Sequence, residues 1–114
     1  MSVQELLEKL KKQPANVEFA EVMAVIAENY HYQPTRFVNG GITNEAGSNE
    51  GSCKIFAFAK MHDLDKGQTL ACFGKYYRDD VLLHPEGSDH ANIRHFIKNG
   101  WEGLQFDAVP LNVL

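Results

Sequence analysis

The stretch CKIFAFAKMH, residues 53–62, decides the fold. Its length and composition predict a helix, and its apolar side chains leave that helix almost no polar face: Ile55, Phe56, Ala57, Phe58, Ala59 and Met61. A helix that is apolar on all sides belongs in the centre of a hydrophobic core. We therefore expect residues 53–62, capped by Ser52 or Asn49, to form the central helix of the domain.

Four further helices are expected on either side of this segment. The first begins with the capping-box pair Ser2 and Glu5 and ends before Pro14. The remaining expected boundaries are Asn16 as cap of the second helix, Asp65 before a long fourth helix that continues to His84-Pro85, and Ser88 or Asp89 before a fifth that ends at Asn99-Gly100.

Two regions have the pattern of strands. Residues 35–38 are rich in strand formers, and the turn Asn39-Gly40 leads from them to Ile42-Thr43, which predicts a small hairpin or a single edge strand. Residues 104–106 alternate, and the apolar tail 109–114 is expected to pair with the strand near Phe37. The predicted fold class is α+β, mainly α, with about five helices and a small sheet from the Thr35-Thr43 region and the C-terminal segment.

Composition limits the classes of function. The 114 residues, 44% hydrophobic and 23% charged, predict one globular domain over residues 1–114. The net charge is -4, and the only dense basic cluster, Lys9, Lys11 and Lys12, suits the end of the first helix, so we expect no nucleic-acid partner. Apolar runs are far shorter than the roughly 20 residues of a membrane span, so we expect no membrane association.

The ordered motifs of the chain resemble the HopJ family of bacterial type III effector proteins. The resemblance lies in NEAG at residues 44–47, GSCKIFA at 51–57, TLACFG at 69–74, YYR at 76–78 and HPEG at 84–87, and it continues from Asp89-His90 to Gly100-Trp101. It implies an effector-like protein without an established enzymatic activity. On this basis we expect a binding or interaction domain whose partner is a protein or a small molecule, in an oligomeric state that remains open.

The sequence is compatible with two cellular locations. The chain begins with polar residues, and Cys53 and Cys72 form no Cys-x-x-Cys pair, which favours reduced thiols in a bacterial cytoplasm. The family resemblance implies secretion into a host cell. An injected effector usually begins with a flexible segment rich in serine, whereas a capped helix is expected from Ser2.

Cys53 is the basis of an alternative function, a thiol-dependent hydrolase or transferase. The residue follows Gly51-Ser52 at the predicted start of a helix, where the dipole and free amides lower a thiol pKa and can hold an oxyanion. The candidate catalytic set is Cys53 as nucleophile, His90 as base with His84 or His62 as alternatives, and Glu45, Asp89 or Asn92 as orienting group. The competing interpretation is that Cys53 is a small buried hydrophobe.

The candidate ligand-binding residues lie in the loop 44–53 and the turn 84–94: Asn44, His84, Asp89 and Arg94, together with Arg78. An arginine beside carboxylate or amide groups can clamp a ligand carboxylate or phosphate, although an internal ion pair is the commoner use. His90 and His95 are five positions apart and diverge by about 140° on a helix, so we expect no bound metal. No cofactor is predicted.

Overall fold

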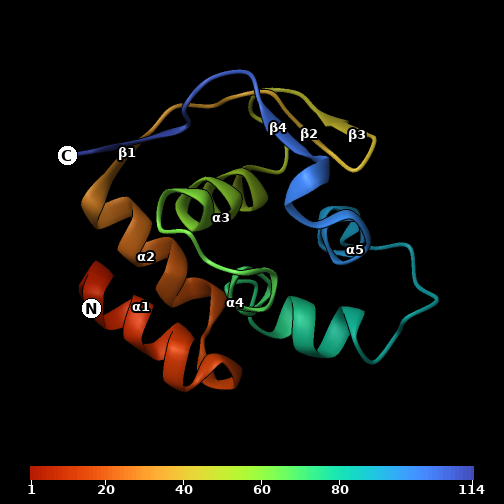
Figure 1. The fold of residues 1–114 in the computed structure, drawn as a ribbon, viewed down its shortest axis with the longest axis horizontal. Coiled ribbons are helices and arrows are strands. Elements are labelled where there is room, and N and C mark those ends of the chain that lie inside the picture. The colour runs from red at the N-terminus through yellow and green to blue at the C-terminus, as the bar shows by residue number, and fades with distance from the viewer.

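Helix α3 (Glu50–Met61) runs through the middle of the protein, as its sequence predicts (Figure 1). The computed structural model describes all residues, 1–114. Every residue from Ile55 to Ala59 is buried, and Phe56 and Phe58 are inaccessible to solvent. The Phe56 ring meets the rings of Phe37, Phe73 and Phe96 from three other parts of the chain. The central helix therefore organises the core.

Four more α-helices surround α3. They are α1 (Val3–Lys12), α2 (Phe19–Asn29), α4 (Lys66–Ala71) and α5 (Ala91–Asn99). Short helical turns supplement them at Pro14–Asn16 and Gly100–Gly103, and the segment η2 (Tyr76–Val81) is a π-helix. None of the helices is long and apolar enough to cross a lipid bilayer.

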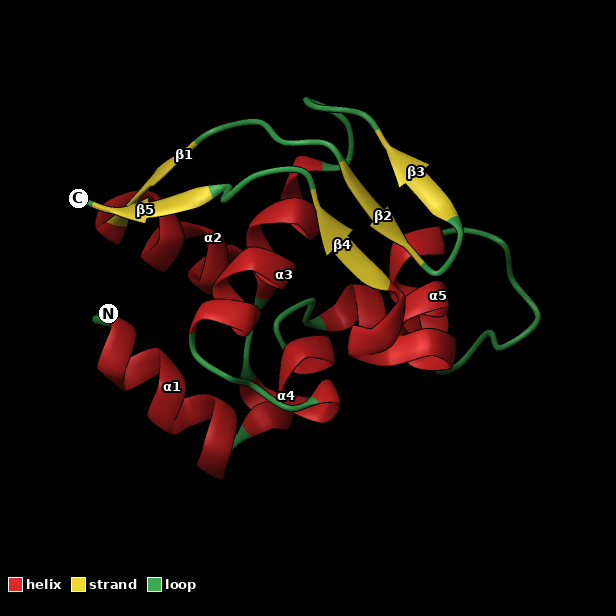
Figure 2. Ribbon diagram, turned by 45° about the horizontal axis from the view of Figure 1, so that its top comes forward, coloured by secondary structure: helices red, strands yellow, loops and turns green.

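Two small antiparallel sheets lie along one side of the molecule, with α1 and α4 on the other side and α3 between (Figure 2). The predicted hairpin forms from β2 (Phe37–Asn39) and β3 (Ile42–Asn44), and β4 (Leu104–Phe106) completes the order β3-β2-β4. The second sheet joins β1 (Tyr30–Tyr32) to β5 (Leu111–Val113). The α+β, mainly helical fold class is confirmed.

The prediction that the C-terminal tail pairs near Phe37 was wrong in its partner. The partner of Phe37 is Phe106 in β4, whereas the tail strand β5 pairs with Tyr30 to Tyr32 at the end of α2. Pairing of these short strands is decided by where the helices bring their ends, and the sequence pattern does not encode it.

The prediction of one long fourth helix was also wrong. Helix α4 ends at Ala71, and the chain passes through Gly74 in a left-handed conformation before η2 begins. A Cβ at Gly74 would lie 2.8 Å from the amide nitrogen of Phe19, so the chain breaks where it meets the start of α2. The apolar stripe was right even so, because Leu70, Phe73 and Val81 are all buried.

Two expected helix caps differ in the structure. Helix α2 begins after Glu18, whose N–H donates to the Glu21 carboxylate, because Asn16 belongs to the preceding turn. Helix α5 has His90 at its N-cap position, where Ser88 or Asp89 was expected. The Asp89 carboxylate accepts a hydrogen bond from Arg94 and so is engaged elsewhere.

Candidate ligand-binding site

Helices α3 and α5 begin without a side-chain cap. Their N-cap residues, Asn49 and His90, are both left-handed, with φ of 52° and 51°, and neither side chain accepts a hydrogen bond from the first helical turn. The first backbone N–H groups of a helix have no partner within the helix. We call residues 49–52 and 90–92 the open helix starts, because the amides of residues 50–52, 91 and 92 have no hydrogen-bond partner in the protein.

Both open helix starts face one cavity of about 360 Å³. Its polar lining consists of Asn49, Ser52, His90 and Asn92, and its aromatic wall of Phe19, Phe73 and Tyr76. The loop 44–53 and the turn 84–94, which the sequence singled out separately, therefore contribute to the same hollow. Its volume falls in the range of small-molecule sites, about 300–1,000 Å³.

A buried network of asparagine amides joins the two open helix starts. Asn44 and Asn92 exchange hydrogen bonds of 3.1 and 2.9 Å, and the Asn49 amide donates to the Asn44 oxygen at 2.7 Å. Asn39 adds donations to the backbone and side-chain oxygens of Asn92 at 2.8 and 3.0 Å. Strands β2 and β3 thereby hold the start of α5 against the start of α3, which fixes the shape of the cavity.

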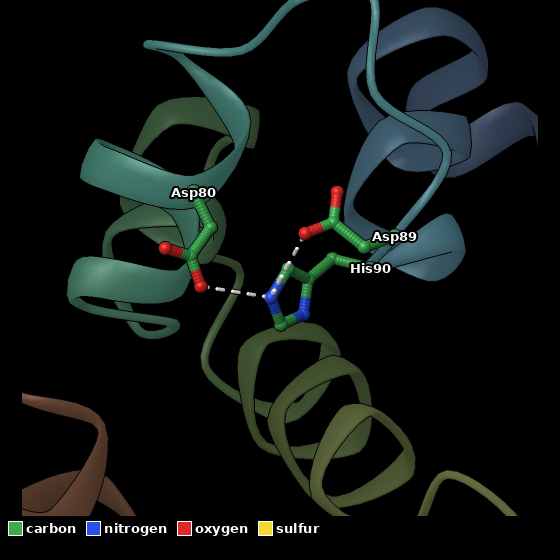
Figure 3. A group of neighbouring side chains, drawn as sticks. All are labelled: Asp80, Asp89 and His90. Atoms are coloured by element: carbon green, nitrogen blue, oxygen red, sulfur yellow. Dashed lines mark hydrogen bonds and ion pairs between the residues drawn. The ribbon is translucent and has the colours of Figure 1, made fainter.

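His90 stands at the edge of the cavity between two carboxylates (Figure 3). Its Nε2 atom lies 3.0 Å from Asp80 Oδ2 and 3.8 Å from Asp89 Oδ2, while its ring packs on Tyr76 at 5.2 Å between centroids. Asp80 comes from η2, whereas Asp89 directly precedes His90 before α5. The second ring nitrogen, Nδ1, has no hydrogen-bond partner in the protein.

Arg94 holds this arrangement in place. Its guanidinium donates to the backbone oxygens of Asp89, His84 and Asp80 at 2.7, 2.8 and 3.3 Å, and to Asp89 Oδ1 at 2.7 Å. That last hydrogen bond lowers the pKa of the Asp89 carboxyl below its ordinary value. A Cβ at Gly87 would come within 2.6 Å of the guanidinium, so a larger residue there would displace the Arg94 side chain. Arg94 therefore positions Asp80 and Asp89 and does not line the cavity.

The other predicted ligand-binding residues lie in different places. Asn44 is buried in the amide network behind the cavity. Arg78 donates to the Val17 backbone oxygen at 2.8 Å and approaches Glu18 at 3.6 Å, so it makes an internal pair at the start of α2. The His84 side chain is exposed on the turn. Neither Arg78 nor His84 lines the cavity.

The three residues of the hydrolase hypothesis are not linked to one another. Cys53 is 1% exposed, its sulfur approaches the Thr35 backbone oxygen at 3.8 Å, and burial raises the pKa of its thiol. Glu45 is exposed and pairs with Arg36 at 3.6 Å. Neither residue hydrogen-bonds to His90, whose partner is Asp80. Cys53 thus has the environment of a core residue, although its neighbour Ser52 lines the cavity.

The sequence did not identify Asp80 or Tyr76 as site residues. Both belong to η2, and they reach His90 because the chain breaks at Gly74 and resumes as a π-helix. The run Tyr76-Tyr77-Arg78-Asp79-Asp80 was noticed for its arginine alone. A single sequence does not show that residues of this segment come close to His90 in the folded protein.

Comparison with known proteins gives a family and a structural relative. A family model described as HopJ type III effector protein matches residues 3–111. The crystal structure of VPA0580, a protein of unknown function, is 52% identical and superimposes with a TM-score of 0.98, covering 100% of this chain and 95% of that chain. No curated protein matches. Similarity to this relative supports the fold but assigns no activity.

Proposed function

The chain belongs to the HopJ family, and we propose that it is a binding domain for a small organic anion, held in the cavity between the open helix starts. The observation that carries the proposal is the convergence of two uncapped helix N-termini on one cavity. Helices α1 and α4 satisfy their first amides with the side chains of Ser2 and Asp65. Helices α3 and α5 leave theirs for a ligand.

The chemistry of the lining defines the ligand. A helix N-terminus presents N–H donors and the positive end of the helix dipole, equivalent to about half an elementary charge, to an anion. Asn49 and Ser52 add side-chain donors beside those amides. Phe19 and Tyr76, whose rings pack edge to face at 5.1 Å, offer a wall for a flat apolar group. A carboxylate or phosphate on an aromatic or similarly flat body fits both parts.

Phenyl phosphate is a suitable probe. We expect it to bind saturably in calorimetry with EDTA present, with a Kd on the order of 1 mM for a ligand of this size. The neutral analogue phenol lacks the anionic group and should bind more weakly. Ser52→Leu places a larger side chain in the cavity and should abolish binding, whereas Ser48→Leu, on the exposed loop just before α3, should leave it unchanged.

The proposal fails if phenyl phosphate and phenol bind equally, because the open helix starts would then contribute nothing. It also fails if Ser48→Leu and Ser52→Leu weaken binding to the same extent. Saturable binding of a protein from the host or the bacterium at this face, blocked by neither variant, would favour an interaction domain in place of a small-ligand site.

The family description adds a place of action to this proposal. A type III effector meets its ligand inside a host cell, whereas the alternative is a ligand of the bacterial cytoplasm. Fusion to an enzyme reporter that is active only in host cytosol separates the two. A signal that depends on the type III apparatus supports injection, and a reporter that stays in the bacteria supports the cytoplasmic role.

A further inference from the structure

We propose that Asp80, Asp89 and His90 form a binding site for a divalent transition-metal ion at the edge of the cavity (Figure 3). The site goes beyond the proposed ligand-binding function and does not depend on it, because its ligands are all side chains of the protein. One potential ligand atom from each residue lies within 4.8 Å of the other two.

The distances are close to those of a metal coordination shell. Carboxylate oxygens and imidazole nitrogens bind zinc at about 2.0–2.2 Å, which places neighbouring ligand atoms roughly 3.0–3.5 Å apart in octahedral or tetrahedral geometry. His90 Nε2 lies 3.0 Å from Asp80 Oδ2 and 3.8 Å from Asp89 Oδ2. The three ligand atoms lie within 4.8 Å of one another, so the two carboxylates must move closer together to share one ion.

Hydrogen bonding alone does not account for the arrangement. The Nε2 atom of an imidazole carries at most one hydrogen, which is directed at one acceptor, yet two carboxylate oxygens converge on it. Arg94 holds Asp89 through Oδ1 and leaves Oδ2 turned toward His90. The same arginine ties the Asp80 and Asp89 backbones together. Arg94 thus fixes the backbones of Asp80 and Asp89 and the orientation of the Asp89 carboxylate.

The cavity supplies a second, independent observation. His90 is both a member of the cluster and a lining residue of the cavity, so an ion on Nε2 has space for water or a ligand oxygen on the open side. Two carboxylates so close together repel each other, and a divalent cation between them offsets their charge. One imidazole with two carboxylates suits manganese, iron(II) or zinc better than calcium, which prefers oxygen ligands alone.

The test uses metal ions without any organic ligand. Wild-type protein freed of metal is titrated with MnCl₂ and ZnCl₂ by calorimetry, with Mn²⁺ paramagnetic resonance as a second readout. We expect one site per chain. Asp80→Asn and His90→Asn should weaken binding by about tenfold or more, since each removes a ligand atom. Asparagine is chosen at position 90 because it tolerates the left-handed backbone found there.

Matched controls come from the same segment. Asp79→Asn and His84→Asn remove a neighbouring carboxylate and a neighbouring imidazole outside the cluster, and should leave the affinity within about twofold, the scatter expected of surface changes. Metal should raise the melting temperature of the wild type and both controls, but not of the two cluster variants, which circular dichroism must show to be folded.

Three results overturn the inference: no saturable site in the wild type, equal binding by the cluster variants, or loss of binding in His84→Asn. They are distinguishable from failure of the ligand proposal, because phenyl phosphate is titrated in EDTA and the metals are titrated alone.

Discussion

The five α-helices of this protein begin in two different ways. Helices α1 and α4 close their first turns with their own side chains, as in the reciprocal pair Asp65 and Gln68 at 2.7 and 3.1 Å, and in α2 the Glu21 carboxylate accepts from the N–H of Glu18. Helices α3 and α5 begin at the left-handed residues Asn49 and His90 and have no such cap. The difference separates helix ends whose first amides are satisfied by side chains from helix ends whose first amides are not, and the proposed ligand site lies at the second kind.

Two adjacent residues of α3 have different environments. Ser52 lines the cavity, whereas Cys53 is buried in the core. We expect alkylation of Cys53 to be orders of magnitude slower than that of a free model thiol at pH 7, because burial raises its pKa and the protein must open to expose it. Mass spectrometry of peptides after timed iodoacetamide treatment measures this. Fast labelling with an inflection below pH 7 that moves in His90→Asn would restore the hydrolase hypothesis.

The amide network should carry the largest stability effect at the open helix starts. Asn92→Ala removes three side-chain hydrogen bonds, one with Asn39 and two with Asn44, while the Asn39 amide keeps the backbone oxygen of residue 92 and the Asn44 amide keeps that of Phe37. A hydrogen bond contributes about 0.5–1.5 kcal/mol net, so the loss of these bonds should lower the free energy of unfolding by about 3 kcal/mol. Urea denaturation gives the value, with the exposed Ser48→Ala as control. A loss below about 1 kcal/mol would mean that the network does not hold the two helices together.

Alkaline pH should lower the free energy of unfolding through the buried thiol of Cys72. Burial raises the pKa of Cys72 from 9.0 to about 12, so the folded protein holds this proton more tightly than the unfolded chain. The resulting stabilisation is complete below pH 9 and is lost as the pH rises from 9 toward 12, with a slope of at most about 1.4 kcal/mol per pH unit. Chemical denaturation at several pH values should give a shallower slope for Cys72→Ala. Equal slopes would show that the thiol titrates normally.

Removing a helix cap should have the smallest effect on the free energy of unfolding, and it compares a capped helix start directly with an uncapped one. Asp65→Ala deletes the acceptor of the Gln68 N–H and should cost about 1 kcal/mol. Ser52→Ala removes a side chain that caps nothing, so its effect on unfolding should stay within about 0.5 kcal/mol. Thermal denaturation of the two variants side by side measures both. A similar cost for both would indicate that Ser52 stabilises its helix start after all.

Local pattern was enough to predict the core and parts of the sheet. The apolar run 53–62 and the hairpin have their structural causes within a few residues, and both form, although the turn lies at Gly40-Gly41, one residue after the predicted Asn39-Gly40. The break of the fourth helix has a distant cause, the approach of Gly74 to Phe19. A contact between residues so far apart in sequence cannot be predicted from a local pattern. The pairing of the C-terminal strand also depends on such a distant contact.

The candidate site also has parts that the sequence predicted and parts that depend on distant contacts. Turn chemistry singled out the loop 44–53 and the turn 84–94, and the structure places both at one cavity. The role of Arg94 was predicted only as a choice between a ligand clamp and an internal partner, and its hydrogen bonds are internal. Asp80 joins His90 only because the π-helix turns it there, so sequence spacing could not reveal the cluster.

The most direct test is whether the amides of the open helix starts bind the anion. ¹H–¹⁵N NMR spectra recorded during a titration with phenyl phosphate show which amide signals shift. The largest shifts should fall on Gly51, Ser52, Ala91 and Asn92, whose N–H groups have no partner within their helices. The capped start of α4, residues 66–68, should not move. Shifts at the capped start of equal size, or no shifts at the open helix starts, would contradict the account.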